Sequence, residues 1–113
     1  MIRLDNTTRS LVLSLAGNIQ SNQLQIVANY SDNNGTTYTG GTKTTLSNNT
    51  SYVTIVAAPA ASTVRDIDNI AIYNKDNVSS IVNVLLNDNS TYYQIINTIL
   101  QTGESLLYTH GQG

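Results

Sequence analysis

The stretch YVTIVAAPAASTVRDIDNIAIY, Tyr52–Tyr73, decides the fold class of this chain. Two runs rich in β-branched residues flank Pro59, the single proline of the sequence, and alanines surround that proline. β-Branched runs that end at a turn are typical of buried strands, and proline cannot donate a hydrogen bond within a central strand. The stretch therefore predicts two strands of a buried sheet, joined by a corner at Pro59.

Apolar and polar residues alternate in other segments too. Leu11, Leu13 and Leu15 alternate with neighbouring residues, and Leu24–Tyr30 repeats the pattern. This period of two is typical of strands with one buried face. Strands are also predicted over three later segments: Ser80–Leu86, Thr91–Leu100 and Ser105–Thr109. Segment 91–100 also fits helical spacing, but its tyrosines and turn-rich ends favour a strand. Roughly seven to eight strands predict an all-β antiparallel β-sandwich or jelly roll, in one domain over residues 1–113.

Two polar segments lie outside these predicted strands. Met1–Thr8 precedes the first strand and is predicted to be an extended arm or a disordered end. Ser31–Asn49 is dense in Asn, Gly, Thr and Ser, and it contains the tight-turn pair Asn34–Gly35. We expect a long polar loop or β-excursion there, with a short strand near Thr36–Thr39. Loops of this length usually carry function or are mobile.

The composition argues against several classes of function. Charged residues make up 11% of the chain, the net charge is −2, and the five basic residues are scattered. Such a weak field does not attract nucleic acid or an anionic membrane, so neither is expected as a partner. No apolar run approaches the ~18 residues that span a bilayer, and the amino terminus lacks the apolar core of a signal peptide. We expect synthesis in a cytoplasm without export.

The sequence contains few of the residues that usually act as catalytic groups. His110 is the only histidine, it lies close to the carboxyl terminus among glycines, and the chain has no cysteine. A tail is a poor place to hold a general base, so His110 is interpreted as an exposed tail residue. We predict that the protein is not an enzyme and has no cofactor.

Asp66 and Asp68 are weak candidates for a calcium site. Because they are two residues apart on a predicted strand, their side chains point to the same side, and Asn69 or Asp76 could add a further oxygen ligand. The simpler interpretation is a solvated pair, or ion pairs with Arg65 or Lys75. We therefore predict no bound metal.

Tyrosine supplies all seven aromatic residues of the chain. Exposed tyrosines beside Asn suit either a sugar-binding site or a polar protein interface, and they also suit the rim of a sandwich. The candidates for an interface or a ligand site are Tyr38, Asn33, Asn34, Tyr92 and Tyr93.

The order of motifs in the second half resembles a family of small virion proteins of tailed bacteriophages. The motifs are IVAAPA (Ile55–Ala60), STVR (Ser62–Arg65), IYN (Ile72–Asn74), NDNST (Asn87–Thr91), TGESLLYT (Thr102–Thr109) and GQG (Gly111–Gly113). Members of that family usually continue after the terminal glycines into a strand with a tryptophan, whereas this chain stops. Val64–Arg65 and Ile95–Ile96 also occupy positions where basic residues are more usual.

The resemblance implies a β-sandwich in a phage particle, assembled in the bacterial cytoplasm. The expected function is that of a non-enzymatic structural protein, a capsid decoration or cement subunit or another head-attached accessory. Its expected partners are capsid or other virion proteins and further copies of itself, for example in a trimer. A surface poor in charge fits such contacts, because little charge must be desolvated. The alternative is a tail or fibre domain that binds host-surface carbohydrate through the 31–49 segment and Tyr38.

Overall fold

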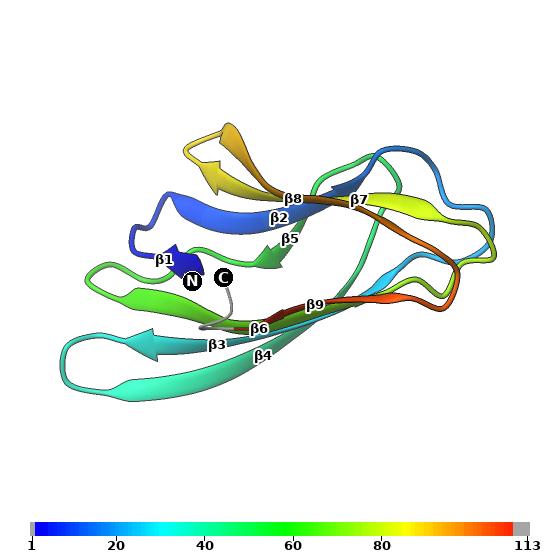
Figure 1. The fold of residues 1–113 in the computed structure, drawn as a ribbon. Helices are drawn as coiled ribbons and strands as arrows, with labels where there is room; N and C mark the ends of the chain where they lie inside the picture. Colours follow the sequence, from blue (N-terminus) through cyan, green and yellow to red (C-terminus); the bar gives the residue numbers. More distant parts are fainter. Residues whose placement is uncertain (1, 110–113) are drawn as a thin grey trace.

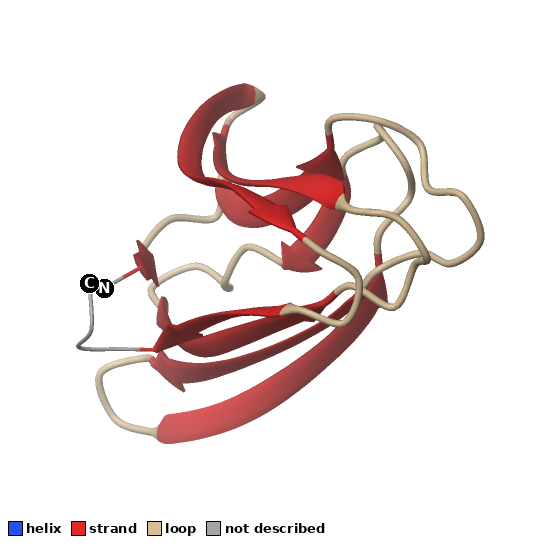
Figure 2. Cartoon of the chain, turned by 45° about the vertical axis from the view of Figure 1, so that its right-hand side comes forward, coloured by secondary structure: helices blue, strands red, loops and turns tan. Residues whose placement is uncertain are grey.

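The computed structural model describes residues 2–109. These residues form nine β-strands and no helix, arranged as two antiparallel sheets that pack face to face (Figure 1, Figure 2). The strands are β1 (Ile2–Leu4), β2 (Arg9–Leu15), β3 (Gln25–Asn33), β4 (Tyr38–Leu46), β5 (Val53–Val56), β6 (Val64–Tyr73), β7 (Ser80–Asp88), β8 (Thr91–Leu100) and β9 (Ser105–Thr109). The predicted all-β sandwich is confirmed, and so is the strand assignment for residues 91–100.

The two layers divide the strands as follows. Sheet A has the order β1-β6-β3-β4, and β9 lies beside β6 on the same side as β1. β1 pairs with residues 65–67 and β9 with residues 69–73, so both lie end to end along one edge. Sheet B has the order β5-β2-β7-β8. Figure 1 shows sheet B above sheet A, with β8 and β9 at the front.

The core fills the space between the inner faces of the sheets. Leu11, Leu13 and Leu15 of β2 are at most 2% exposed, as the alternating pattern predicts. The Tyr52–Tyr73 stretch contributes five core residues: Ile55, Val56, Ile67, Ile70 and Ile72. Its two strands belong to different sheets, because the corner after Pro59 carries the chain from β5 in sheet B to β6 in sheet A.

Of the two alternatives predicted for residues 31–49, the long polar loop is wrong and the β-excursion is present, with its strand over Tyr38–Leu46 instead of near Thr36–Thr39. β3 extends to Asn33, and β4 pairs with it over nine residues without a register shift. The polar composition was misleading, because threonine favours strands and an edge strand facing solvent needs no apolar residues. The turn within this hairpin is at the predicted place, where Gly35 has a φ of 95°.

The prediction of an arm over residues 1–8 is also wrong for the part that the structure describes. Residues 2–4 form β1, which pairs with β6 of the same chain. Leu4 is fully buried in the core, and the backbone N–H of Ile2 donates to the Tyr108 hydroxyl at 2.7 Å. Two apolar side chains, Leu4 in the core and Ile2 packed against it, thus dock this polar segment.

Asp76 fastens the end of the sandwich where β6 leads into β7. Its carboxylate accepts hydrogen bonds from the backbone N–H groups of Gln20, Ser21, Asn22 and Asn77, at 2.8–3.1 Å. Burial alone raises the pKa of a carboxyl, but these four donors outweigh it and lower the pKa of Asp76 to about 2. The ionised carboxylate of Asp76 therefore holds the backbone of residues 20–22 beside the turn after β6.

Candidate interaction surfaces

Three of the predicted site residues lie at the tip of the β3–β4 hairpin. Tyr38 begins β4 and is 67% exposed. The side-chain oxygen of Asn33 accepts from Gly35 N at 2.9 Å. That of Asn34 accepts from the backbone N–H groups of Thr36 and Thr37, at 3.0 and 2.8 Å. These two asparagine oxygens therefore build the turn, and all three side chains remain exposed at the tip.

A shallow polar pocket lies beside the same tip, but it does not use Tyr38. Its lining is Asp32, Asn34, Thr37, Thr39, Ala60, Thr63 and Arg65. Tyr38 pairs with Asn33, whereas Thr39 pairs with Asp32, so the side chains of Tyr38 and Thr39 point to opposite faces of the sheet. The structure thus separates the predicted sugar-binding tyrosine from the pocket.

Arg65 is occupied by contacts within the chain. Its Nε and Nη2 donate to the Asp32 carboxylate at 2.7 and 2.9 Å, and its Nη1 donates to the Ala57 carbonyl at 2.9 Å. The guanidinium lies 4.2 Å from the centre of the Tyr30 ring. The hydrogen bond with Asp32 raises the pKa of Arg65 above its ordinary value. Arg65 therefore ties β6 to β3 and to the segment after β5.

The structure separates Asp76 from the other two candidate calcium ligands, and Asp66 and Asp68 have other partners. Asp66 forms an ion pair with Arg3 at 2.8 Å, and Asp68 accepts from the Ser31 hydroxyl at 2.5 Å. Asp76 lies beyond the opposite end of β6. Among residues 2–109, no three or more His, Cys, Asp or Glu side chains form a group that could hold a metal ion. His110 lies outside the described residues.

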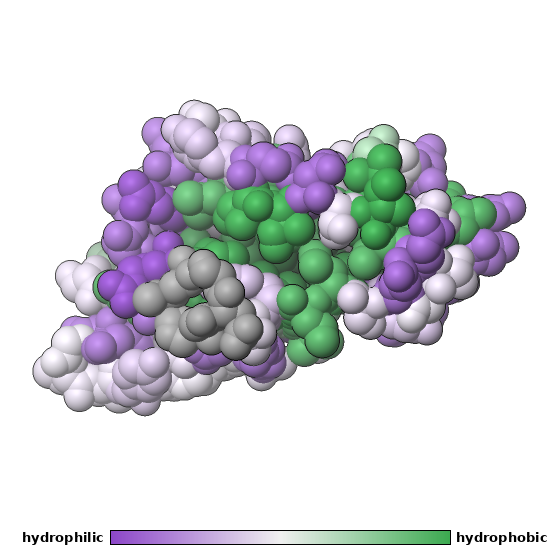
Figure 3. Space-filling view, viewed as in Figure 1, coloured by the Kyte–Doolittle hydropathy of each residue, from purple (hydrophilic) through white to green (hydrophobic). Residues whose placement is uncertain are grey.

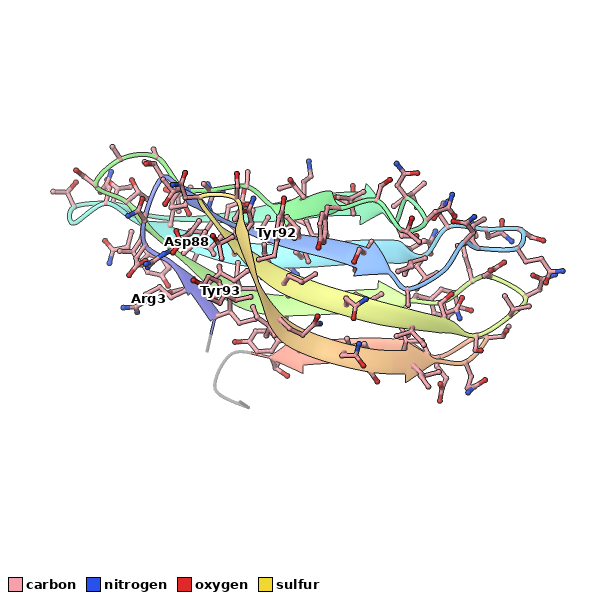
Figure 4. All side chains as sticks on the ribbon, turned by 90° about the horizontal axis from the view of Figure 1, so that it is seen from above. Arg3, Asp88, Tyr92 and Tyr93 are labelled. Carbon is pink, nitrogen blue, oxygen red and sulfur yellow. The ribbon has the colours of Figure 1, made fainter. Side chains whose placement is uncertain are left out.

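The other two predicted residues, Tyr92 and Tyr93, lie at the start of β8 and leave it in different directions (Figure 4). Tyr93 is 55% exposed. Tyr92 stacks on Tyr52, with ring centroids 4.3 Å apart. Sequence reasoning missed this pair, because Tyr52 is 40 positions away and comes together with Tyr92 only in the folded sheet.

A more extended surface, also not predicted, covers the outer face of sheet A near β9. We define the β9 surface as Val27, Ala71, Tyr73 and Leu107. The register aligns Val27, Ala71 and Leu107 in one row across β3, β6 and β9, with Tyr73 in the adjacent row. Leu107 is 71% exposed, the highest value among the large hydrophobic side chains of residues 2–109. Exposed apolar side chains that gather on one face of a sheet are a feature of interaction sites.

The apolar character continues around the edge of β9 into the seam between the sheets. Leu106 of β9 and Ile96 of β8 are only partly buried against the core. Figure 3 shows hydrophobic residues gathered between β8 and β9 on this side of the molecule. The adjacent pair Leu106–Leu107 could have indicated this surface. Neighbouring residues on a strand face opposite sides of the sheet, so one of the two leucines has to lie on the outer face.

The fold is that of an all-β two-sheet sandwich. No protein-family model, curated protein or solved structure matches the chain. Within residues 2–109 the structure has no helix of the length and hydropathy that a membrane crossing requires. The resemblance to phage virion proteins therefore stays a prediction.

Proposed function

We propose that the chain is a non-enzymatic structural subunit of a bacteriophage particle, specifically a decoration or cement protein on the outside of the head. In this role it stabilises the shell by burying its own surface against capsid subunits. The β9 surface is the observation that carries the proposal, because an exposed apolar face in a polar, weakly charged chain suits a permanent contact. The motif order of residues 55–113 supplies the link to phage particles.

Charge distribution also supports a docking role. Arg3, Arg9 and Arg65 each form an ion pair with an aspartate of the same chain. The β9 surface itself contains no charged residue. Removing it from water therefore costs little electrostatic free energy, while the hydrophobic gain is about 25 cal/mol per Å² of apolar area.

Binding to empty shells tests this function. Capsid shells assembled without the chain, from the phage whose genome encodes it, are mixed with purified protein and sedimented. We expect saturable binding at a fixed ratio to the capsid subunit. Leu107→Thr keeps a good strand former but removes the most exposed apolar side chain, and it should weaken binding about tenfold or more.

Ile99→Thr is the matched control. Ile99 is 56% exposed but lies on the outer face of sheet B, opposite Ile81. Its substitution should leave binding to shells unchanged. A wild-type chain that does not bind capsid shells, or that binds host glycans or phage tails instead, contradicts the decoration role. Glycan binding that is lost on Tyr38→Ala would establish the alternative of a fibre domain.

A further inference from the structure

β4 is a long strand with one open edge. It pairs with β3 over nine residues, and within residues 2–109 it has no strand on its other side. The backbone N–H and C=O groups along such an edge form a template for another strand.

The other edges formed by residues 2–109 carry features that discourage strand pairing. β8 has a register shift opposite Val84 and Leu85, so its edge is irregular. β5 has only four residues. The far edge of sheet A is divided between the short strands β1 and β9. β4 pairs in regular register along its whole length and carries a single charged residue, Lys43. Native proteins usually protect an edge of this kind.

We infer that β4 pairs with β4 of a second copy of this chain, antiparallel and across a two-fold axis at Thr42. Thr42 is the midpoint of Tyr38–Leu46, so this register is the one that pairs every residue of the strand. It joins two copies of sheet A edge to edge into one continuous sheet. Because the contact is the same on both copies, it closes with two chains, which favours a dimer over the trimer expected from the sequence.

The side chains on the outer face are complementary in this register. Tyr38 faces Leu46 of the second copy, and the symmetry makes this contact twice. In the single chain these side chains are 67% and 57% exposed, the largest exposed apolar groups on β4. Opposed aromatic and aliphatic side chains stabilise antiparallel strands. Thr42 faces its own symmetry mate, and Thr44 faces Gly40.

The inner face of β4 also fits. Lys43 lies opposite Gly41 of the second copy, whereas an axis at Lys43 itself would place two like charges directly opposite each other. The single chain already requires glycine at residue 41, because a Cβ there would come within 2.5 Å of the Tyr30 ring. The register that gives full overlap is thus also the register that separates the lysines.

Disulfide trapping tests the register, because the native chain has no cysteine. In Thr42→Cys the two cysteines face each other across the axis, with Cα atoms about 4.5–5.5 Å apart, within the range that a disulfide spans. Thr44→Cys is the matched control on the same strand and face. Its two copies are four residues out of register, about 13 Å apart.

Under mild oxidation we expect Thr42→Cys to form covalent dimers at least tenfold faster than Thr44→Cys. Sedimentation of the wild-type chain should give the mass of a dimer, and Thr42→Lys, which places two lysines on the axis, should give a monomer. A wild-type monomer or trimer, equal trapping of the two cysteine variants, or a dimeric Thr42→Lys overturns the inference.

This pairing does not depend on the phage role, since it is measured on the purified chain alone. β4 and β9 lie on opposite edges of sheet A, so Leu107→Thr should leave the dimer intact. A chain that dimerises but ignores capsid shells would contradict only the proposed function, and a monomer that binds shells would contradict only the pairing.

Discussion

Tyr52 and Tyr92 stack face to face over sheet B, with ring centroids 4.3 Å apart and ring planes 8° apart. Tyr52 directly precedes β5 and Tyr92 belongs to β8, the two edges of that sheet. Val12 and Leu85 pair with each other on the outer face between these edges, yet they are only 3% and 7% exposed. They are not part of the main core cluster. We attribute their burial to the stacked tyrosines.

Removing Tyr92 should therefore uncover this outer apolar pair. Tyr92→Ala is expected to lower the free energy of unfolding by about 1–3 kcal/mol, from the lost stacking and the newly exposed Val12 and Leu85. Urea denaturation measures the change. Tyr93→Ala, at the next position and 55% exposed, should cost clearly less. Equal losses in the two variants would mean that the stack does not protect the sheet.

Arg65 should not tolerate replacement by lysine. Lysine cannot make the two-pronged contact with Asp32 while also donating to the Ala57 carbonyl, so Arg65→Lys should lose about 1–2 kcal/mol of stability. Arg3→Lys is the control, since the side chain of Arg3 is 52% exposed against 14% for Arg65. The loss of stability in Arg3→Lys should be clearly smaller, because an exposed ion pair contributes little. Thermal or urea unfolding of both variants distinguishes a structural Arg65 from a dispensable one.

The neighbouring glycines of β4 should differ in tolerance. Gly41→Ala should destabilise by about 1 kcal/mol, because the Cβ displaces the Tyr30 ring, over which Arg65 is held. At Gly40 the nearest atom to an added Cβ is the Tyr30 carbonyl oxygen, 3.8 Å away, an ordinary contact. Gly40→Ala should therefore be neutral or slightly stabilising. A tolerated alanine at residue 41 would show that the ring moves freely.

Asp76 should make the stability of the folded chain depend on pH at low pH. Its pKa in the folded chain is about 2, below the ordinary 3.8, so the folded state favours the ionised form. The resulting stabilisation is present above about pH 4 and is lost as the pH falls toward 2. Asp76→Asn should lower Tm by several degrees at pH 7, and its difference from wild type should shrink between pH 4 and pH 2. A difference that is constant over this range would contradict the assignment.

The fold could be predicted from the sequence where one face of a strand is buried. Leu11, Leu13 and Leu15 alternate because only one side of β2 meets the core, and such periodicity is visible in a single chain. β4 could not be predicted in this way. Its nine residues contact solvent on most sides, so neither face demands apolar residues and the pattern resembles a loop. β1 was not predicted for a related reason: it has only three residues, and Leu4 is its one fully buried side chain.

The candidate surfaces were harder to predict than the strands. Tyr38 is exposed, as the sequence suggested, but Asn33 and Asn34 use their oxygens to form the turn. The β9 surface depends on the register of three strands that are distant in sequence. A single sequence does not specify that register. The same limit hid the open edge of β4, which is recognisable only once the sheet order is known.

A reconstruction of the phage particle tests the central claim most directly. The proposed function predicts density for this sandwich on the outside of the head, bound to capsid subunits, with Leu107 and the rest of the β9 surface covered by the shell. Density confined to the tail or its fibres, or a head-bound subunit whose β9 surface faces solvent, would contradict it.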